Sequence, residues 1–177
     1  MKRISQALVI GALVGFGSMA SAQGVYVEAG YTPLSLDARY AGVDISSDPS
    51  SLRGLVGYEL GPFVAVEGMI SFGVADDDIS GNGISTGLKG EVDNMFGAYI
   101  KPKFPVTPEF DLFGRLGFAS TKLSVAGDSG TETSLSWGLG ASYKINEQLS
   151  INGDYMTYHD KDDVTIDGFT VGVGFRF

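Results

Sequence analysis

The last nine residues of the chain, 169–177, alternate strictly between apolar side chains and small or polar ones. Because successive side chains of a β-strand point to opposite faces, this stretch predicts a strand with one continuous apolar face. The strand runs to the final residue, where a soluble domain more often frays into a polar tail. A closed barrel orders its terminus, because its last strand must pair with its first. The apolar row consists of Phe169, Val171, Val173, Phe175 and Phe177.

The first 22 residues have the pattern of a cleaved secretory signal. A short positive region, Lys2-Arg3, precedes an apolar stretch over 7–16, and Ala20-Ser21-Ala22 matches the A-x-A cleavage motif. The apolar stretch is too short to span the ~30 Å hydrocarbon core of a bilayer, which argues against a transmembrane anchor. We therefore expect a signal peptide over 1–22, followed by a single domain over 23–177.

Charge and cysteine content exclude several classes of protein. The formal net charge is −9, and without the first 22 residues the chain carries 10 basic against 21 acidic residues. This acidic balance argues against a nucleic-acid partner and against a basic patch for anionic lipid. The sequence contains no cysteine, so we expect neither disulfides nor a lipid-attachment site. The 26 glycines, with frequent Tyr, Phe, Val and Thr, favour strands over helices.

Seven further stretches alternate at the same period, which makes eight predicted strands. They are 25–31, 52–60, 64–72, 92–103, 110–119, 135–144 and 149–156. The connections after the first, third, fifth and seventh strands are long and polar, about 35–50, 76–90, 127–132 and 159–163. The other three are short turns, and this asymmetry is typical of bacterial outer-membrane barrels. The predicted fold class is all-β, an eight-stranded antiparallel up-and-down transmembrane β-barrel.

Alternation alone does not say whether the apolar face lies outside the barrel. A soluble periplasmic barrel that binds an apolar ligand would turn the same face inward. The opposite face, however, is unusually small and charged, and aromatic residues end the apolar rows. Phe110 and Phe118 are eight residues apart, as are Phe169 and Phe177. At ~3.3 Å per residue this is about 26 Å, close to the ~25 Å apolar band of a membrane barrel, so we expect the apolar face to meet lipid.

Four segments carry a resemblance to a known family through their order and spacing. They are Arg53-Gly54-Leu55-Val56-Gly57-Tyr58, Glu67, Leu112-Phe113-Gly114-Arg115-Leu116-Gly117, and Gly172 to Phe177. Over nearly all of 23–177 the chain resembles the small eight-stranded outer-membrane β-barrels, the class of OmpX and the OmpA transmembrane domain. The resemblance implies contact with outer-membrane lipid and lipopolysaccharide, and recognition of the terminal apolar row by the outer-membrane assembly machinery. Because the chain stops at Phe177, the peptidoglycan-binding domain of full-length OmpA is not expected.

Charged residues fall on the face that would line the barrel. An eight-stranded barrel has an interior just wide enough for side chains to fill, and buried charges there must be paired. We expect a structural polar plug in which Arg115 pairs with Glu67, with Glu28 as a second acceptor, and a gated ion path is the alternative. The candidate plug residues are Glu28, Arg53, Glu67, Arg115, Lys144 and Asp154. The charges expected near the periplasmic mouth are Glu59, Lys101, Asp111, Lys144 and Arg176.

Motifs for catalysis or metal binding are weak. Some small outer-membrane barrels modify lipid A with a His, a Ser and an acid, but no Ser stands near His159, the sole histidine. The acidic runs 76–78 and 160–163 lack the spacing of a calcium-binding loop. We therefore predict no catalytic, cofactor or metal residues. The expected function is that of a monomeric structural or surface-interaction protein, with a lipid A-modifying enzyme and a soluble periplasmic barrel as the alternatives.

Overall fold

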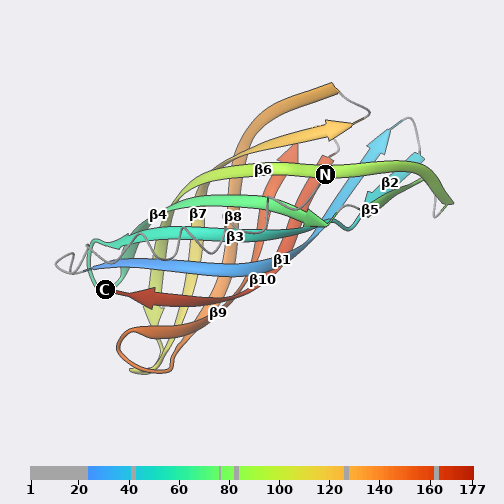
Figure 1. Cartoon of the computed structure of the whole chain (residues 1–177). Coiled ribbons are helices and arrows are strands. Elements are labelled where there is room, and N and C mark those ends of the chain that lie inside the picture. The colour runs from blue at the N-terminus through green and yellow to red at the C-terminus, as the bar shows by residue number, and fades with distance from the viewer. Residues whose placement is uncertain (1–23, 41–42, 76, 82–83, 126–127, 162–163) are drawn as a thin grey trace, which may run out of the picture.

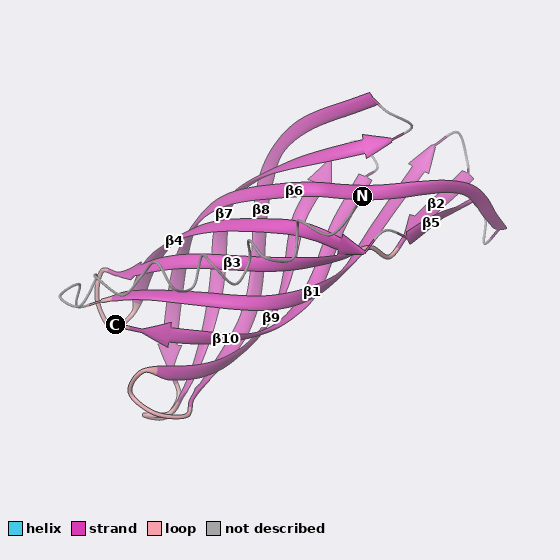
Figure 2. Ribbon diagram, viewed as in Figure 1, coloured by secondary structure: helices cyan, strands magenta, loops and turns pink. Residues whose placement is uncertain are grey.

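The computed structural model describes residues 24–40, 43–75, 77–81, 84–125, 128–161 and 164–177 of the chain. Within these ranges the secondary structure consists of β-strands (Figures 1 and 2). No helix among the described residues is long and apolar enough to cross a membrane. The strands are β1 (Val25–Tyr40), β2 (Val43–Ser47), β3 (Ser50–Glu59), β4 (Val64–Ala75), β5 (Asp77–Gly81), β6 (Ile84–Pro105), β7 (Phe110–Val125), β8 (Asp128–Lys144), β9 (Leu149–Lys161) and β10 (Val164–Arg176).

Eight of these strands form one closed antiparallel barrel. In order around the wall they are β1, β3, β4, β6, β7, β8, β9 and β10. The wall is closed by β10, which pairs with β1 from Tyr26↔Arg176 to Ala38↔Val164. Figure 1 shows these two strands side by side, with the C-terminus at the end that carries the short turns. The predicted eight-stranded antiparallel barrel is confirmed.

Strands continue far beyond the ends that the apolar alternation marks, and this corrects the predicted loops. The expected loop at 35–50 holds the end of β1 and all of β2, and the one at 76–90 holds β5 and the start of β6. At 127–132 and 159–163, the described residues belong to β8 and β9. β2 pairs with β1, and β5 pairs with both β2 and β6. In the β1 extension the apolar residues change faces, from the row that ends at Tyr31 to the row of Leu34 and Leu36, and the other extensions are mostly polar, so no apolar row continues the one that marks the membrane strand.

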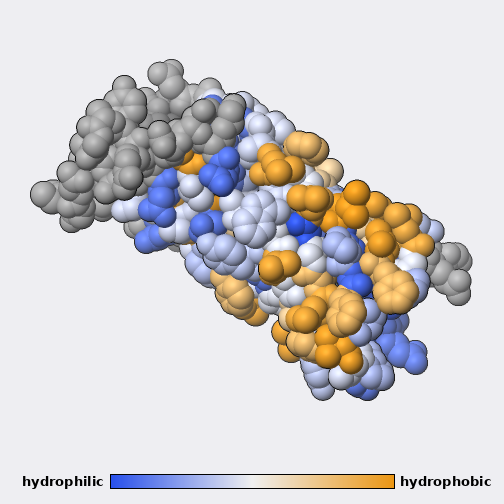
Figure 3. Space-filling model, turned by 180° about the vertical axis from the view of Figure 1, so that it is seen from behind, coloured by the Kyte–Doolittle hydropathy of each residue, from blue (hydrophilic) through white to orange (hydrophobic). Residues whose placement is uncertain are grey.

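The outer surface of the barrel is apolar. Large hydrophobic side chains are exposed on every barrel strand, and on the face shown in Figure 3 they appear in orange along the right-hand half of the barrel. One example from each strand, in barrel order, is Tyr31, Val56, Ile70, Ile100, Leu116, Leu139, Ile151 and Val171. A soluble protein rarely exposes so extensive an apolar surface. The alternative of a soluble barrel with its apolar face inside is therefore wrong.

A β-bulge in β9 changes which side chains point inward. β9 pairs with β10 at Asp167↔Thr157 and then at Ile166↔His159, so Tyr158 has no partner residue on β10. As a result the alternation of buried and exposed side chains is lost there, and residues 156–159 are all buried. The sequence analysis placed His159 in a charged loop, and this is corrected: it lies in β9. Strict alternation cannot locate such a residue, because a bulge breaks the period of 2.

Candidate functional site inside the barrel

Arg115 lies at the centre of a buried network of charges. Its Nε donates to Glu67 Oε2 at 2.5 Å, and its Nη2 donates to Glu67 Oε1 at 3.2 Å and to Glu28 Oε2 at 2.8 Å. The arginine comes from β7, and the two carboxylates come from β4 and β1. The planar guanidinium fork suits this task, because it can serve two carboxylates and stays charged when buried. The structure thus brings together the three residues that were expected to meet.

Lys101 of β6 is a second cation in contact with the same carboxylates. Its Nζ lies 2.9 Å from Glu28 Oε1 and 2.9 Å from Glu67 Oε1. Lys101 was expected to lie near the periplasmic mouth, but its ammonium group lies in the central network. A lysine carries its charge on a long stem, so the height of its Cα does not fix the height of its ammonium group.

Two aromatic side chains complete this part of the site, and neither was among the candidates. The Tyr26 hydroxyl donates to Glu67 Oε1 at 2.6 Å. The Phe113 ring lies beneath both cations, with its centroid 4.3 Å from Lys101 Nζ and 4.6 Å from Arg115 Cζ. A cation over an aromatic face gains electrostatic attraction, more so where water is excluded. Tyr26 and Phe113 both alternate with lipid-facing neighbours, so their position on the inward row could have identified them as interior residues.

Arg53 and Asp154 form a second, linked pair towards the extracellular side. Arg53 donates through two nitrogens to the two oxygens of Asp154, at 2.5 and 2.7 Å, and through Nη1 to the Tyr158 hydroxyl at 3.0 Å. Asp154 Oδ1 also lies 2.8 Å from Arg115 Nη1, which joins this pair to the central group. Arg53 and Asp154 were predicted to lie inside the barrel. Tyr158 was missed because it lies in the β-bulge, where the alternation breaks.

Charge is balanced within the network. Its carboxylates are Glu28, Glu67 and Asp154, and its cations are Arg53, Lys101 and Arg115. Each of these side chains is at most 8 % exposed. Removing an ion from water carries a penalty of several kcal/mol, which only close opposite charges and hydrogen bonds offset. The arrangement satisfies that condition and ties together six of the eight barrel strands.

Lys144 does not join this network, although it was among the plug candidates. Its Nζ lies 2.9 Å from Asp111 Oδ2 near the end with the short turns, and its side chain is 31 % exposed. At the same end, Glu59 accepts from Lys103 Nζ and from Arg176 Nη2, both at 2.6 Å. These residues line a cavity of about 50 Å³. The plug candidates are therefore divided between the central network and the mouth.

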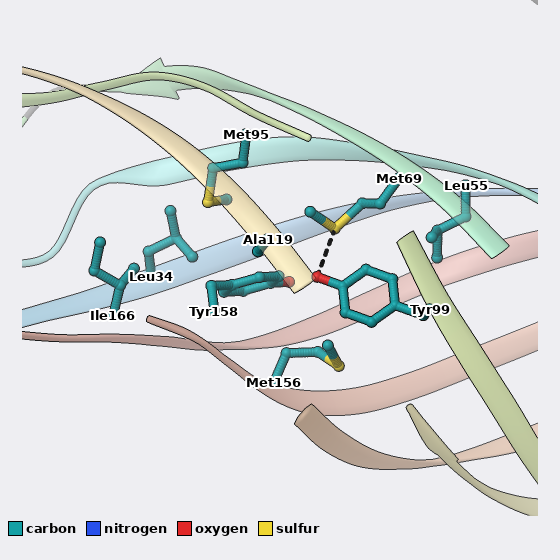
Figure 4. Close-up of a cluster of buried hydrophobic side chains, with 9 residues drawn as sticks. All are labelled: Leu34, Leu55, Met69, Met95, Tyr99, Ala119, Met156, Tyr158 and Ile166. Carbon is teal, nitrogen blue, oxygen red and sulfur yellow. Dashed lines mark hydrogen bonds between the residues drawn. The ribbon is translucent and has the colours of Figure 1, made fainter. Parts of the chain in front are cut away.

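An apolar layer adjoins the network on the side of the long strand extensions and meets it at Tyr158, whose hydroxyl accepts from Arg53. Figure 4 shows its side chains pointing into the barrel from several strands, with the Tyr99 hydroxyl directed at Met69 Sδ, 3.9 Å away. The layer consists of Leu34, Leu55, Met69, Met95, Tyr99, Ala119, Met156, Tyr158 and Ile166, all buried. This layer was not predicted, because the inward-facing side chains were expected to be small or charged.

The terminal strand presents its apolar row outward. Phe169, Val171, Val173 and Phe175 are exposed on the surface of the barrel. Phe177 is half-buried, donates its N–H to Val25 O at 3.1 Å, and packs edge-on against Phe175 with ring centroids 5.2 Å apart. The end of the chain is thus held on the first strand at the end with the short turns.

His159 has one ionic neighbour in the described part of the chain, Glu132 Oε2 at 3.8 Å from its Nε2. No serine hydroxyl among the described residues is hydrogen-bonded to it. The described residues also contain no group of three or more His, Asp and Glu side chains placed to hold a metal ion. Of the two acidic runs, Asp76 and 162–163 lie outside the described residues.

A family model for the outer membrane protein beta-barrel domain matches residues 7–177, which is almost the whole chain. The chain belongs to this family. As an outer-membrane barrel, it crosses the bacterial outer membrane with its apolar exterior in lipid. The short turns then face the periplasm, and the long strand extensions face the outside of the cell. No curated protein matches the chain in sequence.

Solved structures share the fold of this outer-membrane barrel at low sequence identity. Ail, the attachment invasion locus protein of Yersinia pestis, solved with the heparin analogue sucrose octasulfate, is 22 % identical with a TM-score of 0.60, over 88 % of this chain and 99 % of that one. OprG from Pseudomonas aeruginosa is 14 % identical with a TM-score of 0.63, over 88 % and 97 %. Neisserial surface protein A is 18 % identical with a TM-score of 0.58, over 88 % and 98 %.

Proposed function

We propose that this outer-membrane barrel is a non-conducting structural protein that interacts with partners through its extracellular strands. The observation that carries the proposal is the filled interior: a charge-balanced network spans the barrel at mid-height. An eight-stranded barrel has no lumen to spare beyond its side chains, so this network acts as a plug that fastens the wall. Binding is then left to the outer surface, where β1, β2, β5 and β6 form one continuous extracellular sheet.

The extracellular partner differs in charge from that of Ail. Ail was solved with a highly sulfated sugar, which is an anion. This chain has a formal net charge of −9, and its extracellular strands include Asp77 and Asp78 of β5 and Asp160 of β9. Like charges repel over the length of a binding surface, so we do not carry the anionic ligand over to this barrel. Its immediate neighbours are outer-membrane lipid and lipopolysaccharide.

The function is tested with a barrel whose extracellular strands are shortened. Removing 39–46 and 78–89 deletes the end of β1, most of β2 and the β5–β6 hairpin tip while leaving the membrane band intact. We expect the shortened barrel to reach the outer membrane at the wild-type level but to lose adhesion of the expressing cells to host-cell or neighbouring bacterial surfaces. Unchanged adhesion, or steady ion conductance of the wild-type barrel in planar bilayers, would contradict the proposal.

The proposal assigns no catalytic step to the chain. A lipid A-modifying enzyme would change the acyl or headgroup pattern of lipid A when expressed, and mass spectrometry of extracted lipid A reports such a change directly. We expect an unchanged pattern with the wild type and with His159→Ala. A new lipid A species that disappears with His159→Ala would establish the enzyme instead.

We also propose that residues 1–22 are a signal peptide and that the terminal row is an assembly signal. The exposed apolar row that ends at Phe177 offers the assembly machinery an extended strand to bind by strand addition. Deleting Phe177, or changing it to Ser, should lower the amount of heat-modifiable barrel in the outer membrane severalfold while export to the periplasm continues. The matched control is Phe118→Ser, which removes an exposed aromatic side chain of β7 and leaves the terminal row unchanged. A normal amount of the barrel in the outer membrane without Phe177 would show that this residue is not part of an assembly signal.

A further inference from the structure

We infer that Glu59 is a positioning residue for release of the barrel from the assembly machinery: its carboxylate binds Arg176, the penultimate residue, and so holds the last strand on the first. Glu59 acts after the terminal row has been recognised, so this role rests on the proposed assembly signal. Glu59 ends β3, and Arg176 ends β10. Arg176 Nη2 donates to Glu59 Oε1 at 2.6 Å, across 117 residues of sequence.

The contact between Glu59 and Arg176 spans β1, the strand that lies between β3 and β10 in the wall. The ends of both neighbours are tied to the start of this strand. Glu59 N–H donates to Gly24 O at 2.8 Å, and on the other side Phe177 N–H donates to Val25 O at 3.1 Å. The ionic contact therefore forms only when β1 has paired with both neighbours, which is the closed state of the wall.

The acceptor is already oriented before the last strand arrives. Lys103 Nζ of β6 donates to the same Oε1 of Glu59 at 2.6 Å, and these two residues are 44 apart in sequence. Their pair belongs to the earlier strands β3, β4 and β6, which are consecutive in the wall, so it forms without β10. The Glu59 side chain is 18 % exposed and that of Lys103 is 10 % exposed, which leaves the carboxylate little freedom. A preoriented group binds its partner at a lower entropic cost.

Glu59 has room for a second cation, and Arg176 is free enough to exchange. An ionised carboxylate has about four acceptor sites, so one lysine does not saturate it. The Arg176 side chain remains 42 % exposed in the closed barrel. It can therefore leave a contact with the assembly machinery and bind Glu59 without crossing the packed interior.

The central charge network does not hold the last strand. Its six charged residues lie on β1, β3, β4, β6, β7 and β9, and none lies on β10. Arg176 supplies an ionic tie that this network does not give to β10. Loss of the tie should therefore affect the step in which the terminal strand is transferred from the machinery to β1.

Release is tested in cells by following the crosslink between the last strand and the assembly machinery. A photocrosslinking amino acid replaces Val173, which is exposed on the terminal row, and pulse-labelled full-length chains are irradiated at successive times. The initial crosslink yield reports recognition, and its decay reports release. We expect Glu59→Gln to leave the initial yield unchanged and to prolong the crosslink by about two- to fivefold, the effect that one partly exposed ion pair can supply.

Asp111→Asn is the matched control. Asp111 pairs with Lys144 at the same mouth, but this pair joins the neighbours β7 and β8 and does not involve the terminal strand. Both variants should lose a similar amount of stability in urea, and only Glu59→Gln should prolong the crosslink. A wild-type lifetime in Glu59→Gln, or equal prolongation in Asp111→Asn, overturns the role of Glu59. If Glu59→Gln gives no heat-modified barrel, Glu59→Asp, which keeps the charge on a shorter stem, is judged by the same criteria.

Deleting Phe177 separates this role from the assembly signal itself. Loss of Phe177 should lower the initial crosslink yield, whereas Glu59 lies outside the terminal row and should not affect it. An unchanged initial yield without Phe177 contradicts the signal alone, because the lifetimes of the wild-type and Glu59→Gln crosslinks are still compared directly.

Discussion

Arg115→Met is expected to destabilise the barrel by about 3–5 kcal/mol, the typical cost of removing one partner from a buried charge group. Arg115 contacts Glu67, Glu28 and Asp154, so its loss leaves these three buried carboxylates against only two cations, Lys101 and Arg53, and strands one negative charge. Methionine keeps an unbranched stem at this position and removes the guanidinium. The measurement is the free energy of unfolding in urea, with the barrel in detergent or lipid.

Adding Glu67→Gln to Arg115→Met should recover part of that loss, because the second change removes a carboxylate and so restores the balance of charge in the network. A double-mutant cycle isolates the coupling between the two residues. The control is Lys144→Met, whose cation pairs with Asp111 near the mouth and is 31 % exposed, so a change of only about 0–1 kcal/mol is expected. Effects of Arg115→Met and Glu67→Gln that add within ~0.5 kcal/mol would show that the pair does not interact.

Gly57→Ala is expected to cost about 1–3 kcal/mol through overpacking. A Cβ at this position would collide with the ring and hydroxyl of Tyr26. That ring has little freedom to move away, since its hydroxyl is bonded to Glu67 and Lys101 Nζ lies 5.0 Å from its centroid. A single methyl group therefore strains the charge network itself, and urea unfolding reports the loss.

Gly68→Ala is the matched control for this change. Gly68 lies on β4 and pairs with Val56 of β3, and an added Cβ there has nothing within 4 Å because the position is exposed on the outer surface. We expect its stability to stay within ~0.5 kcal/mol of wild type, as is usual for surface positions. Equal losses at Gly57 and Gly68 would mean that glycine is needed for the backbone at both positions, and that contact with Tyr26 is not the cause.

The membrane part of the fold could be predicted because lipid imposes a simple pattern. Each strand must turn one side to hydrocarbon, so rows such as that of 110–118 are long, apolar and regular. The same regularity allowed height to be counted from the short turns, which placed Arg115 opposite Glu67. Above the lipid this constraint ends, and for that reason β2 and β5 could not be found.

Inside the barrel the sequence was less informative, for a different reason. The direction of a side chain follows from alternation, but its reach does not. Lys101 and Tyr26 were missed as partners of Glu67 because their polar ends lie far from their own backbone. Tyr158 and His159 were misplaced because a bulge has no compositional mark in this stretch. Alternation predicts which side chains point inward. Which residues they contact depends on how all eight strands are arranged around the barrel.

Closure of the wall has a consequence for how the barrel forms. Val27 pairs with Phe175, so the first and last strands of the domain meet across almost its entire length in sequence. Contacts between such distant residues form late, because the entropy of bringing the ends together must be overcome first. Until β10 arrives, the nascent sheet has two open edges whose unpaired N–H and C=O groups invite pairing with other chains. The stage most prone to aggregation is therefore an open-edged folding intermediate. Its duration is set by how quickly β10 pairs with β1.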